Sequence, residues 1–352
     1  MPRKAIALIS GGLDSMLAAR LMQEQGITVE GVNFYTGFCV EGHTHAIRQR
    51  DGIRRNNALW VAEQLDIPLH IIDVSEEYHD VVLNPRHGYG SELNPCLDCK
   101  IFMVRKTNLL LKGASELADA QEADFIVTGE VIGQRMKSQL KRTMPLIARE
   151  SGADDRLLRP LCAKLLEPTL PEREGWVDRE RLFAFNGRSR QPQIELAKSL
   201  GLKDWAQPAG GCCFLTDASY SRKLRDLWQS RGRREYSLDD ILLLKVGRHL
   251  RPQPHYKVII SREEGENFFL EGYRKRFLHV RVLSHAGPLA LVEGDLHSED
   301  RYVIASLVAR YSQGRDAAWV RVGLFDLQGQ VEEMLVKPLA AEAIPESWHV
   351  GG

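Results

Sequence analysis

The start of the chain holds the feature that most restricts its fold: a short apolar run, a glycine-rich turn and a helical pattern in direct succession. The run is KAIALI at residues 4–9, the turn is Ser10-Gly11-Gly12-Leu13-Asp14-Ser15, and apolar side chains continue at helical spacing towards Gly26. Short continuous apolar runs are typical of strands covered on both faces. A strand that ends in glycines and opens a helix leaves backbone N–H groups unpaired at the positive end of the helix dipole. The turn therefore predicts an anion site.

The residue types in this turn suit a phosphate group. Glycines allow the backbone to approach a phosphate closely, and the hydroxyls of Ser10 and Ser15 add hydrogen-bond donors. Asp14 stands where a carboxylate could hold Mg²⁺ or cap the helix. The turn contains no Gly-Lys-Ser/Thr, which excludes the Walker phosphate loop, because that loop needs its lysine on the terminal phosphates. The alternative is a capped helix after a tight turn, without a ligand.

The pattern of the first 130 residues predicts a parallel sheet. Strands are expected at 28–34 (TVEGVNF), 69–74 (LHIIDV) and 124–129 (DFIVTG), with helices at 46–66 and 97–120 between them. Strands separated by helices form parallel sheets with right-handed crossovers. Beyond residue 237, short strands separated by turns predict a second domain. The expected fold class is α/β, a doubly wound parallel sheet followed by a smaller C-terminal α+β domain.

Composition excludes some classes of protein. The 352 residues carry 47 Lys+Arg and 47 Asp+Glu, so the formal net charge is zero and no overall field attracts nucleic acid. The longest apolar stretches have the length of strands, far short of the roughly 18 residues of a membrane span. The N-terminus leads directly into a strand, with no signal peptide. We therefore expect a cytoplasmic protein without a membrane partner, whose six cysteines act as ligands, catalysts or core residues rather than disulfides.

Two cysteine motifs point to a reactive or metal-binding site. NPCLDCK places Cys96 and Cys99 three residues apart at the start of an expected helix, where both sulfurs share one face and can reach one metal ion or cluster. PAGGCCFLTD adds two adjacent cysteines, which point apart, and we expect Cys212 rather than Cys213 to join the pair. Three thiolates are one short of a closed zinc site or a fully ligated cubane cluster. The core is expected to hold the remaining two, Cys39 and Cys162.

The turn at residues 10–15 resembles the SGGxDS loop of the PP-loop ATP pyrophosphatases, which are adenine nucleotide alpha hydrolase-like proteins. Members of that superfamily cleave ATP between its α and β phosphates, transfer AMP to a carbonyl oxygen and let a nucleophile displace the AMP. The wider resemblance is to tRNA thiouridine synthetase-like members and covers roughly residues 4–230. It is carried by SGGLDS, NPCLDCK, TGEVIGQRMKSQ, LLRPL, GRSRQPQ and PAGGCCFLTD.

The resemblance implies a sulfur chemistry. The iron–sulfur-dependent tRNA thiolation enzymes combine a PP-loop with a Cys-x-x-Cys and one distant cysteine, which correspond here to Cys96, Cys99 and Cys212. Three ligands on a [4Fe–4S] cluster leave one iron open to carry hydrosulfide to an activated carbon. Two alternatives stay open: a metal-free nucleophile and persulfide pair at Cys99 and Cys212, and a structural zinc site with Cys213 as the fourth ligand.

The resemblance also places further residues at the nucleotide. The end of the second strand, with Asn33 and Phe34, would lie beside the adenine. After the strand at 124–129, Gly129 would pass close to the nucleotide, and Glu130 would hold Mg²⁺ or orient the substrate. Contacts to phosphate or RNA are expected from polar side chains of two further motifs: Gln134, Arg135, Ser138, Arg188 and Arg190. Each of these could instead be an ordinary surface residue.

The C-terminal part of the chain favours an RNA ligand. A local basic run interleaved with Trp228 would suit phosphate contacts, or equally a solvated helix face. The run consists of Arg222, Lys223, Arg225, Arg231, Arg233, Arg234, Lys245, Arg248, His249 and Arg251. The stretch from LKVGRHL to REEGEN resembles the RNA-binding module at the C-terminus of NFACT-type proteins.

These features predict three segments: a PP-loop domain at 1–165, an extension at 166–236 with the third cysteine and a basic helix, and an NFACT-like domain at 237–352. The expected activity is that of an ATP-dependent tRNA sulfurtransferase that forms AMP and pyrophosphate. Its cofactors would be ATP, Mg²⁺ and a [4Fe–4S] cluster, and its partners tRNA and a sulfur donor, either sulfide or a sulfur-carrier protein. The alternatives are a PP-loop ligase or sulfur-inserting enzyme acting on a small molecule, and a non-catalytic, nucleotide-regulated RNA-binding protein.

Overall fold

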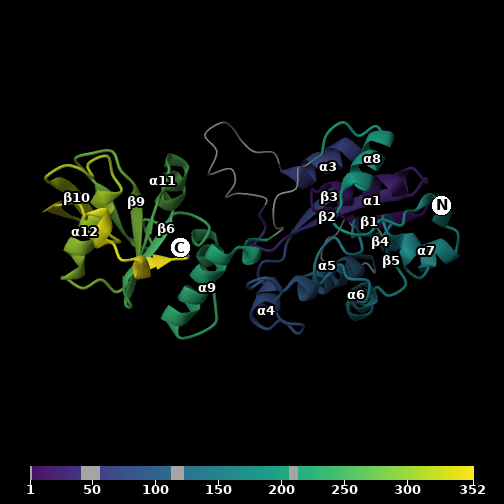
Figure 1. The fold of residues 1–352 in the computed structure, drawn as a ribbon, viewed down its shortest axis with the longest axis horizontal. Helices are drawn as coiled ribbons and strands as arrows, with labels where there is room; N and C mark the ends of the chain where they lie inside the picture. Colours follow the sequence, from purple (N-terminus) through teal and green to yellow (C-terminus); the bar gives the residue numbers. More distant parts are fainter. Residues whose placement is uncertain (1, 41–55, 112–122, 206–212) are drawn as a thin grey trace. The chain divides into compact units, whose positions relative to one another are not determined.

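The computed structural model describes residues 2–40, 56–111, 123–205 and 213–352 (Figure 1). They form two compact units, the first made of Met1–Thr36 and Arg55–Cys212, and the second of Gly37–Arg54 and Cys213–Gly352. The chain thus enters the second unit twice, once after its second strand and again at Cys213. This division assigns most of the expected extension at 166–236 to the first unit, and the part from Cys213 onwards to the second.

The first unit is built on a five-stranded parallel sheet, which confirms the predicted α/β class. The strands lie in the order β3 (Leu69–Asp73), β2 (Thr28–Tyr35), β1 (Lys4–Leu8), β4 (Phe125–Val127) and β5 (Leu157–Leu158). β1 pairs in parallel with β2 on one side and with β4 on the other. The strand order therefore reverses between β1 and β4, and doubly wound sheets bind their ligands beyond the carboxyl ends of the strands at such a reversal.

Helices cover both faces of this sheet (Figure 1). One face carries α1 (Leu13–Gln23), α3 (Asn57–Leu65) and α8 (Gln191–Ser199), and the other carries α5 (Cys96–Leu111) and α6 (Thr143–Ser151). Side chains alternate along β1, so Ala5 and Ala7 pack towards the first group of helices and Ile6 towards the second. The helices expected at 46–66 and 97–120 correspond to α3 and α5, and residues 46–55 and 112–120 of these expected helices lie outside the described residues. Short helices complete the unit: α4 (Tyr78–Leu83), α7 (Leu170–Arg173), and the 3₁₀ helices η1 (Ala163–Leu165) and η2 (Arg179–Arg181).

The second unit holds a seven-stranded antiparallel sheet, which confirms the expected α+β domain. Its strand order is β11 (Val331–Val336), β10 (Val320–Phe325), β8 (Leu278–Val282), β9 (Leu289–Gly294), β7 (Tyr256–Ile260), β6 (Arg248–Gln253) and β12 (His349–Val350). Val258 and Ile260 pack in one hydrophobic cluster with α12 (Asp300–Arg310), whereas Ile259 packs in another with α10 (Leu238–Leu243) and α11 (Glu264–Glu271).

The described residues of the second unit also form α9 (Ala218–Arg231), η3 (Phe214–Thr216), η4 (Ala341–Ala343) and η5 (Glu346–Trp348). None of the helices in the described parts of the chain combines the length and the apolar character needed to cross a membrane.

Candidate active site

The glycine-rich turn lies where the sheet topology predicts a ligand, between the end of β1 and the start of α1. Gly11 is buried and has a positive φ of 78°, and a Cβ there would lie 2.7 Å from the Cβ of Asn57. The Ser15 hydroxyl donates to the Gly12 carbonyl at 2.8 Å and accepts from the Ser10 amide at 3.3 Å. No side chain among the described residues caps α1. Its first N–H groups therefore stay available for an anion.

Gly129, just beyond β4, lies against this turn. A Cβ at Gly129 would lie 2.3 Å from the backbone carbonyl carbon of Asp14 and 2.5 Å from the amide nitrogen of Ser15. Only glycine permits such a close approach of two backbones. The ends of β1 and β4 are thus joined at the first turn of α1. The sequence predicted Gly129 beside the nucleotide, and the structure places it directly behind the residues that would bind it.

Asp14 lies at the centre of a polar cluster drawn from three separate motifs. The Gln134 amide donates to Asp14 Oδ2 at 2.7 Å, and Gln193 of α8 donates to Gln134 Oε1 at 3.3 Å. Burial raises the pKa of the Asp14 carboxyl, outweighing the hydrogen bond from Gln134 and the positive charges of Arg190 and Arg135. Gln193, fully buried, was not singled out from the sequence, although it belongs to the GRSRQPQ motif.

The second carboxylate oxygen of Asp14 suits a divalent cation. Asp14 Oδ1 is buried and accepts no hydrogen bond from the described residues. A buried acceptor of this kind needs a donor or a cation, and Mg²⁺ prefers carboxylate oxygens. The donor set of the site therefore fits the Mg²⁺ expected from the sequence, with Asp14 as the residue that would hold it.

Glu130 is tied into the interior beneath this site. Its Oε2 accepts from Arg159 Nε at 3.1 Å and from the Thr128 hydroxyl at 2.9 Å, and the ion pair is almost fully buried. Burial alone would raise the pKa of Glu130, but the charges of Lys100 and Arg159 hold that pKa below its ordinary value. Oε1 has no partner among the described residues. Oε2 of Glu130 therefore has a structural role, and Oε1 is the atom left for the expected contact with Mg²⁺ or the substrate.

The other residues expected at the nucleotide differ in their exposure. The Asn33 amide donates to the Ile9 carbonyl at 2.7 Å and so ties β2 to the end of β1. Phe34 is 7% exposed and packs in the cluster between the sheet and α5, which leaves little of its ring surface for an adenine.

Cys162 is fully buried and its pKa is raised to about 12 by burial, which confirms its expected place in the core.

The cysteine pair begins α5, as the sequence predicted. Cys96 and Cys99 are both half-buried, and the Cys96 thiol donates to the Ser138 hydroxyl at 3.1 Å. Ser138 is buried and lies four residues after Gln134, in the same loop beyond β4. This loop therefore contacts both Asp14 and Cys96. It physically joins the anion site to the first cysteine of the pair.

The third expected cysteine, Cys212, lies outside the described residues, while Cys213 belongs to the second unit. Cys213 forms an isolated antiparallel bridge with Cys39, and the Phe214 amide donates to the Phe38 carbonyl at 2.9 Å. The expectation that Cys39 is a core residue is therefore wrong: it is half-buried and lies opposite another cysteine. Sequence reasoning missed this because nothing local links the two positions.

Lys245 lies beside this second pair of cysteines. Its ammonium group donates to the Gly37 carbonyl at 2.5 Å and lies 5.0 Å from the centre of the Phe214 ring. Burial lowers the pKa of Lys245 to about 8, although the negative charges of Cys39 and Cys213 oppose this shift. Lys245 was expected to contact phosphate, but it lies buried inside the second unit.

Several other residues of the expected basic run are also buried, or are paired with carboxylates. Lys223 and His249 are buried, and burial lowers the pKa of His249 well below its ordinary value. Arg231 pairs with Asp240 at 2.7 Å, and Arg251 pairs with Asp226 at 2.7 Å. The prediction that the whole basic run contacts phosphate is therefore wrong. The exposed members are Arg222, Arg225, Arg231, Arg233 and Arg234.

Two sequence profiles match this chain. Residues 3–154 match the tRNA methyl transferase HUP domain, and residues 247–349 match the NFACT protein RNA binding domain. The first match, with the parallel sheet and its turn, confirms the resemblance to PP-loop proteins of the tRNA thiouridylase-like kind. The second confirms the resemblance of the C-terminal domain to the NFACT-type module.

Individual relatives agree with these profiles. A tRNA-specific 2-thiouridylase MnmA of Geotalea uraniireducens is 28% identical over 236 residues, which is 64% of this chain and 57% of that protein. One of Flavobacterium johnsoniae is 24% identical over 373 residues, covering 95% of this chain and 87% of that protein. The chain thus spans 57% of the length of the first of these curated relatives. A solved 4-thiouridine synthetase–RNA complex with bound ATP aligns with 57% of this chain and 52% of that one, at 19% identity and a TM-score of 0.31, too low to inform the fold.

Proposed function

We propose that this chain is an ATP-dependent tRNA thiolation enzyme that activates a uridine carbonyl oxygen with AMP and replaces that oxygen with sulfur. The observation that carries the proposal is the loop beyond β4, which hydrogen-bonds to Asp14 through Gln134 and to Cys96 through Ser138. Activation of a carbonyl and delivery of sulfur to it must take place at adjacent points, and this loop holds the two groups of residues in one framework. The 2-thiouridylase relatives support the same reaction class.

The first step uses the residues at the reversal between β1 and β4. The N-terminus of α1 and the hydroxyls of Ser10 and Ser15 bind the phosphates of ATP, and Asp14 would hold Mg²⁺, which would supply positive charge to the pyrophosphate. The carbonyl oxygen attacks the α phosphorus, and pyrophosphate leaves. The products are an O-adenylated base and pyrophosphate, with no change of oxidation state.

The second step removes the oxygen as AMP. A carbonyl oxygen is a poor leaving group, whereas AMP is a good one, so a sulfur nucleophile can add to the carbon and expel it. The chain contributes mainly by positioning, because alignment of nucleophile and adenylate can supply much of the rate acceleration.

Sulfur is carried at Cys96 and Cys99, together with Cys212. The spacing of Cys96 and Cys99 on the first turn of α5 fits two ligands of one cluster. A [4Fe–4S] cluster held by these three residues would supply an open iron that binds hydrosulfide, and the metal-free route would use a persulfide on the same cysteines. Sulfide is the donor for the cluster route. In the metal-free route a sulfur-carrier protein transfers its persulfide sulfur to one cysteine, and the second cysteine breaks the S–S bond after AMP leaves. This forms a disulfide that an external thiol reduces.

RNA binding is assigned to the second unit. Residues 247–349 resemble an RNA binding domain, and exposed arginines on and after α9 add positive charge to the same unit. Phosphate contacts of this kind provide affinity without base specificity, so they should weaken as salt concentration rises.

The test uses the full chain, prepared anaerobically with and without added iron. It is incubated with unmodified tRNA, ATP, Mg²⁺ and sulfide, and the digested RNA is analysed for thionucleosides by mass spectrometry. Thiouridine should form, and should disappear in Asp14→Ala and Cys96→Ala but not in the control Asp154→Ala, whose side chain is exposed. With sulfide as the donor, dependence on iron identifies the cluster route. Thiouridine that forms without iron only when a persulfide-bearing sulfur-carrier protein replaces sulfide identifies the persulfide route.

Other outcomes contradict the proposal. If the protein releases pyrophosphate without RNA and forms no thionucleoside, the acceptor is a small molecule. If the protein binds ATP and tRNA but releases no pyrophosphate, its nucleotide site regulates RNA binding and is not catalytic.

A further inference from the structure

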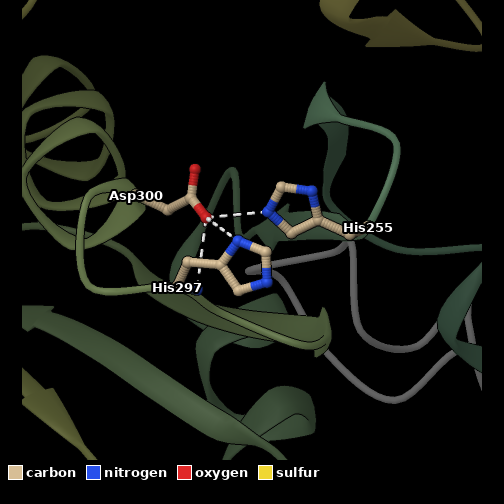
Figure 2. Close-up of side chains that lie close together, drawn as sticks. All are labelled: His255, His297 and Asp300. Atoms are coloured by element: carbon tan, nitrogen blue, oxygen red, sulfur yellow. Dashed lines mark hydrogen bonds and ion pairs between the residues drawn. The ribbon is translucent and has the colours of Figure 1, made fainter.

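Two histidines and one aspartate meet in the second unit, apart from every residue used above (Figure 2). His255 lies in the turn between β6 and β7, His297 in the loop between β9 and α12, and Asp300 at the start of α12. One donor atom from each lies within 4.8 Å of the other two. No other group of three histidine, cysteine, aspartate or glutamate side chains in the described parts of the chain meets this condition. We propose that these three residues bind a divalent transition-metal ion of the Zn²⁺ class.

The spacing of the donor atoms suits such an ion. His255 Nε2 lies 2.8 Å from Asp300 Oδ2, and His297 Nδ1 lies 3.9 Å from the same oxygen. Zinc binds nitrogen and oxygen at about 2.0–2.1 Å, so two ligands of a tetrahedral ion lie about 3.3 Å apart. The two observed separations lie on either side of this value. A shift of about half an ångström in each would bring these two separations to the spacing that zinc requires.

His297 is the residue that has to move, and it is free to turn. The rings of His255 and His297 stack with their centres 4.2 Å apart and their planes at 17°, whereas an ion must lie in the plane of each ring (Figure 2). The side chain of His297 is 57% exposed, so the stacking on His255 is the contact that rotation of its ring would break. Metal binding should therefore break the stacking by turning His297 towards Asp300.

The backbone holds the other two residues in place before any ion arrives. Gly294 has a positive φ of 105°, and a Cβ there would lie 2.2 Å from the His255 carbonyl oxygen. The Asp295 amide donates to that same oxygen at 3.1 Å, and the His297 amide donates to Asp300 Oδ2 at 3.2 Å. The turn that carries His255 is thus pressed against the loop that carries His297.

The charge of Asp300 provides a second reason for a cation. Its side chain is only 8% exposed, and its ion-pair partners among the described residues are the two histidines. A buried carboxylate is stabilised by a positive partner, and a divalent ion would supply one.

The ligand types select the metal. Two imidazoles and one carboxylate suit zinc, cobalt or nickel, whereas magnesium and calcium prefer oxygen ligands alone. Three protein ligands leave a fourth position for water. A simple hydrogen bond between His255 and Asp300 would need only those two residues, so the contribution of His297 distinguishes an ion site from a hydrogen-bonded pair.

The test titrates the metal-free full chain with Zn²⁺ in the presence of a chromogenic chelator, and separately with Co²⁺ followed by its visible absorption. His255→Ala and His297→Ala should each weaken one site by about tenfold or more, since loss even of a residue that only orients a ligand costs 10–100-fold. The matched control is His285→Ala, an exposed histidine of the same unit. Zn²⁺ binding by His285→Ala should match that of the wild type. The Co²⁺ absorption that disappears in His255→Ala and His297→Ala should lack the thiolate charge-transfer band.

Two results would overturn the proposal. The first is unchanged Zn²⁺ affinity in both His255→Ala and His297→Ala. The second is a single site that shows thiolate absorption with Co²⁺ and is lost in Cys96→Ala. Because His297 is largely exposed, its replacement should leave the metal-free melting temperature unaltered, and a melt of each variant checks that the loss of binding is not a loss of folding.

Discussion

Replacement of Gly129 by alanine tests the geometry on which the proposed function depends. The added methyl group would lie 2.3 Å from the Asp14 carbonyl carbon and 2.4 Å from its oxygen, whereas carbon atoms pack at about 3.5–4.0 Å. Both clashing atoms belong to the backbone, so no side chain can turn aside. The first turn of α1 must move away from β4 by about 1 Å to make room.

This displacement should reduce both activity and stability. Overpacking a well-ordered site costs about 1–3 kcal/mol, which corresponds to a melting temperature lower by about 2–12 °C for a unit of this size. A shift of about 1 Å in a positioning residue can lower a rate about 100-fold. Gly129→Ala should therefore release pyrophosphate at about one hundredth of the wild-type rate at saturating tRNA, with a modest loss of thermal stability.

The assay measures pyrophosphate release with ATP and tRNA, together with a thermal melt of each protein. Gly272→Ala is the matched control, because the same change there brings the new Cβ no closer than 3.5 Å to Phe269 oxygen. The control should behave as wild type in both measurements. A wild-type rate and a wild-type melting temperature in Gly129→Ala would refute the reasoning, since the end of β4 could not then lie against the glycine-rich turn.

Three further predictions follow from the polar and thiol contacts. Asp14→Asn should abolish pyrophosphate release and raise the melting temperature at pH 7. Burial raises the pKa of Asp14 in the folded state, so the protonated carboxyl favours folding below the unfolded pKa, and this stabilisation is lost as pH rises through the folded pKa. Arg159→Met should lower the free energy of unfolding by about 3–5 kcal/mol, because it leaves the buried Glu130 carboxylate unpaired. Oxidation of the full chain by a small-molecule disulfide should link Cys39 to Cys213, as the pair lies in non-hydrogen-bonded register, where Cα atoms are about 4.5 Å apart.

Each of these has its own control. The stabilisation in Asp14→Asn should shrink as the pH falls towards 3.8, the ordinary pKa of aspartate, and a constant difference across pH would contradict the burial of its charge. The double variant Glu130→Gln with Arg159→Met should recover most of the lost stability, and failure to recover would show that Arg159 acts through other contacts. Peptide mapping after oxidation should find the Cys39–Cys213 link, and a link from Cys39 to another cysteine in its place would show the bridge to be wrong.

The class of fold was predictable because its signals are local. The apolar run at residues 4–9, the glycines after it and the helical spacing that follows are neighbours in the sequence, and they define strand, turn and helix together. Repetition of that unit leaves a parallel sheet as the consistent arrangement. The pairing of β1 with β2 and β4 agrees with this prediction.

The candidate site was predictable in its residue types but not in its contacts. The sequence pointed to Asp14, Gly129 and the cysteine pair, since each stands in a motif of recognisable spacing. It did not reveal that Gln134 holds Asp14, because that hydrogen bond joins residues 120 positions apart. Nor did it show that Phe34 lies in the core, since a strand covered on both faces has no polar alternation to mark its sides.

The tertiary structure alone decided which chemically similar residues act together. Cys39 meets Cys213, Lys245 turns inward, and His255 meets Asp300 across 45 positions. Strand and helix periods repeat over a few residues, so a sequence contains them directly. The meeting of distant side chains depends on how whole strands and helices pack, and that is settled by the burial of the entire core at once.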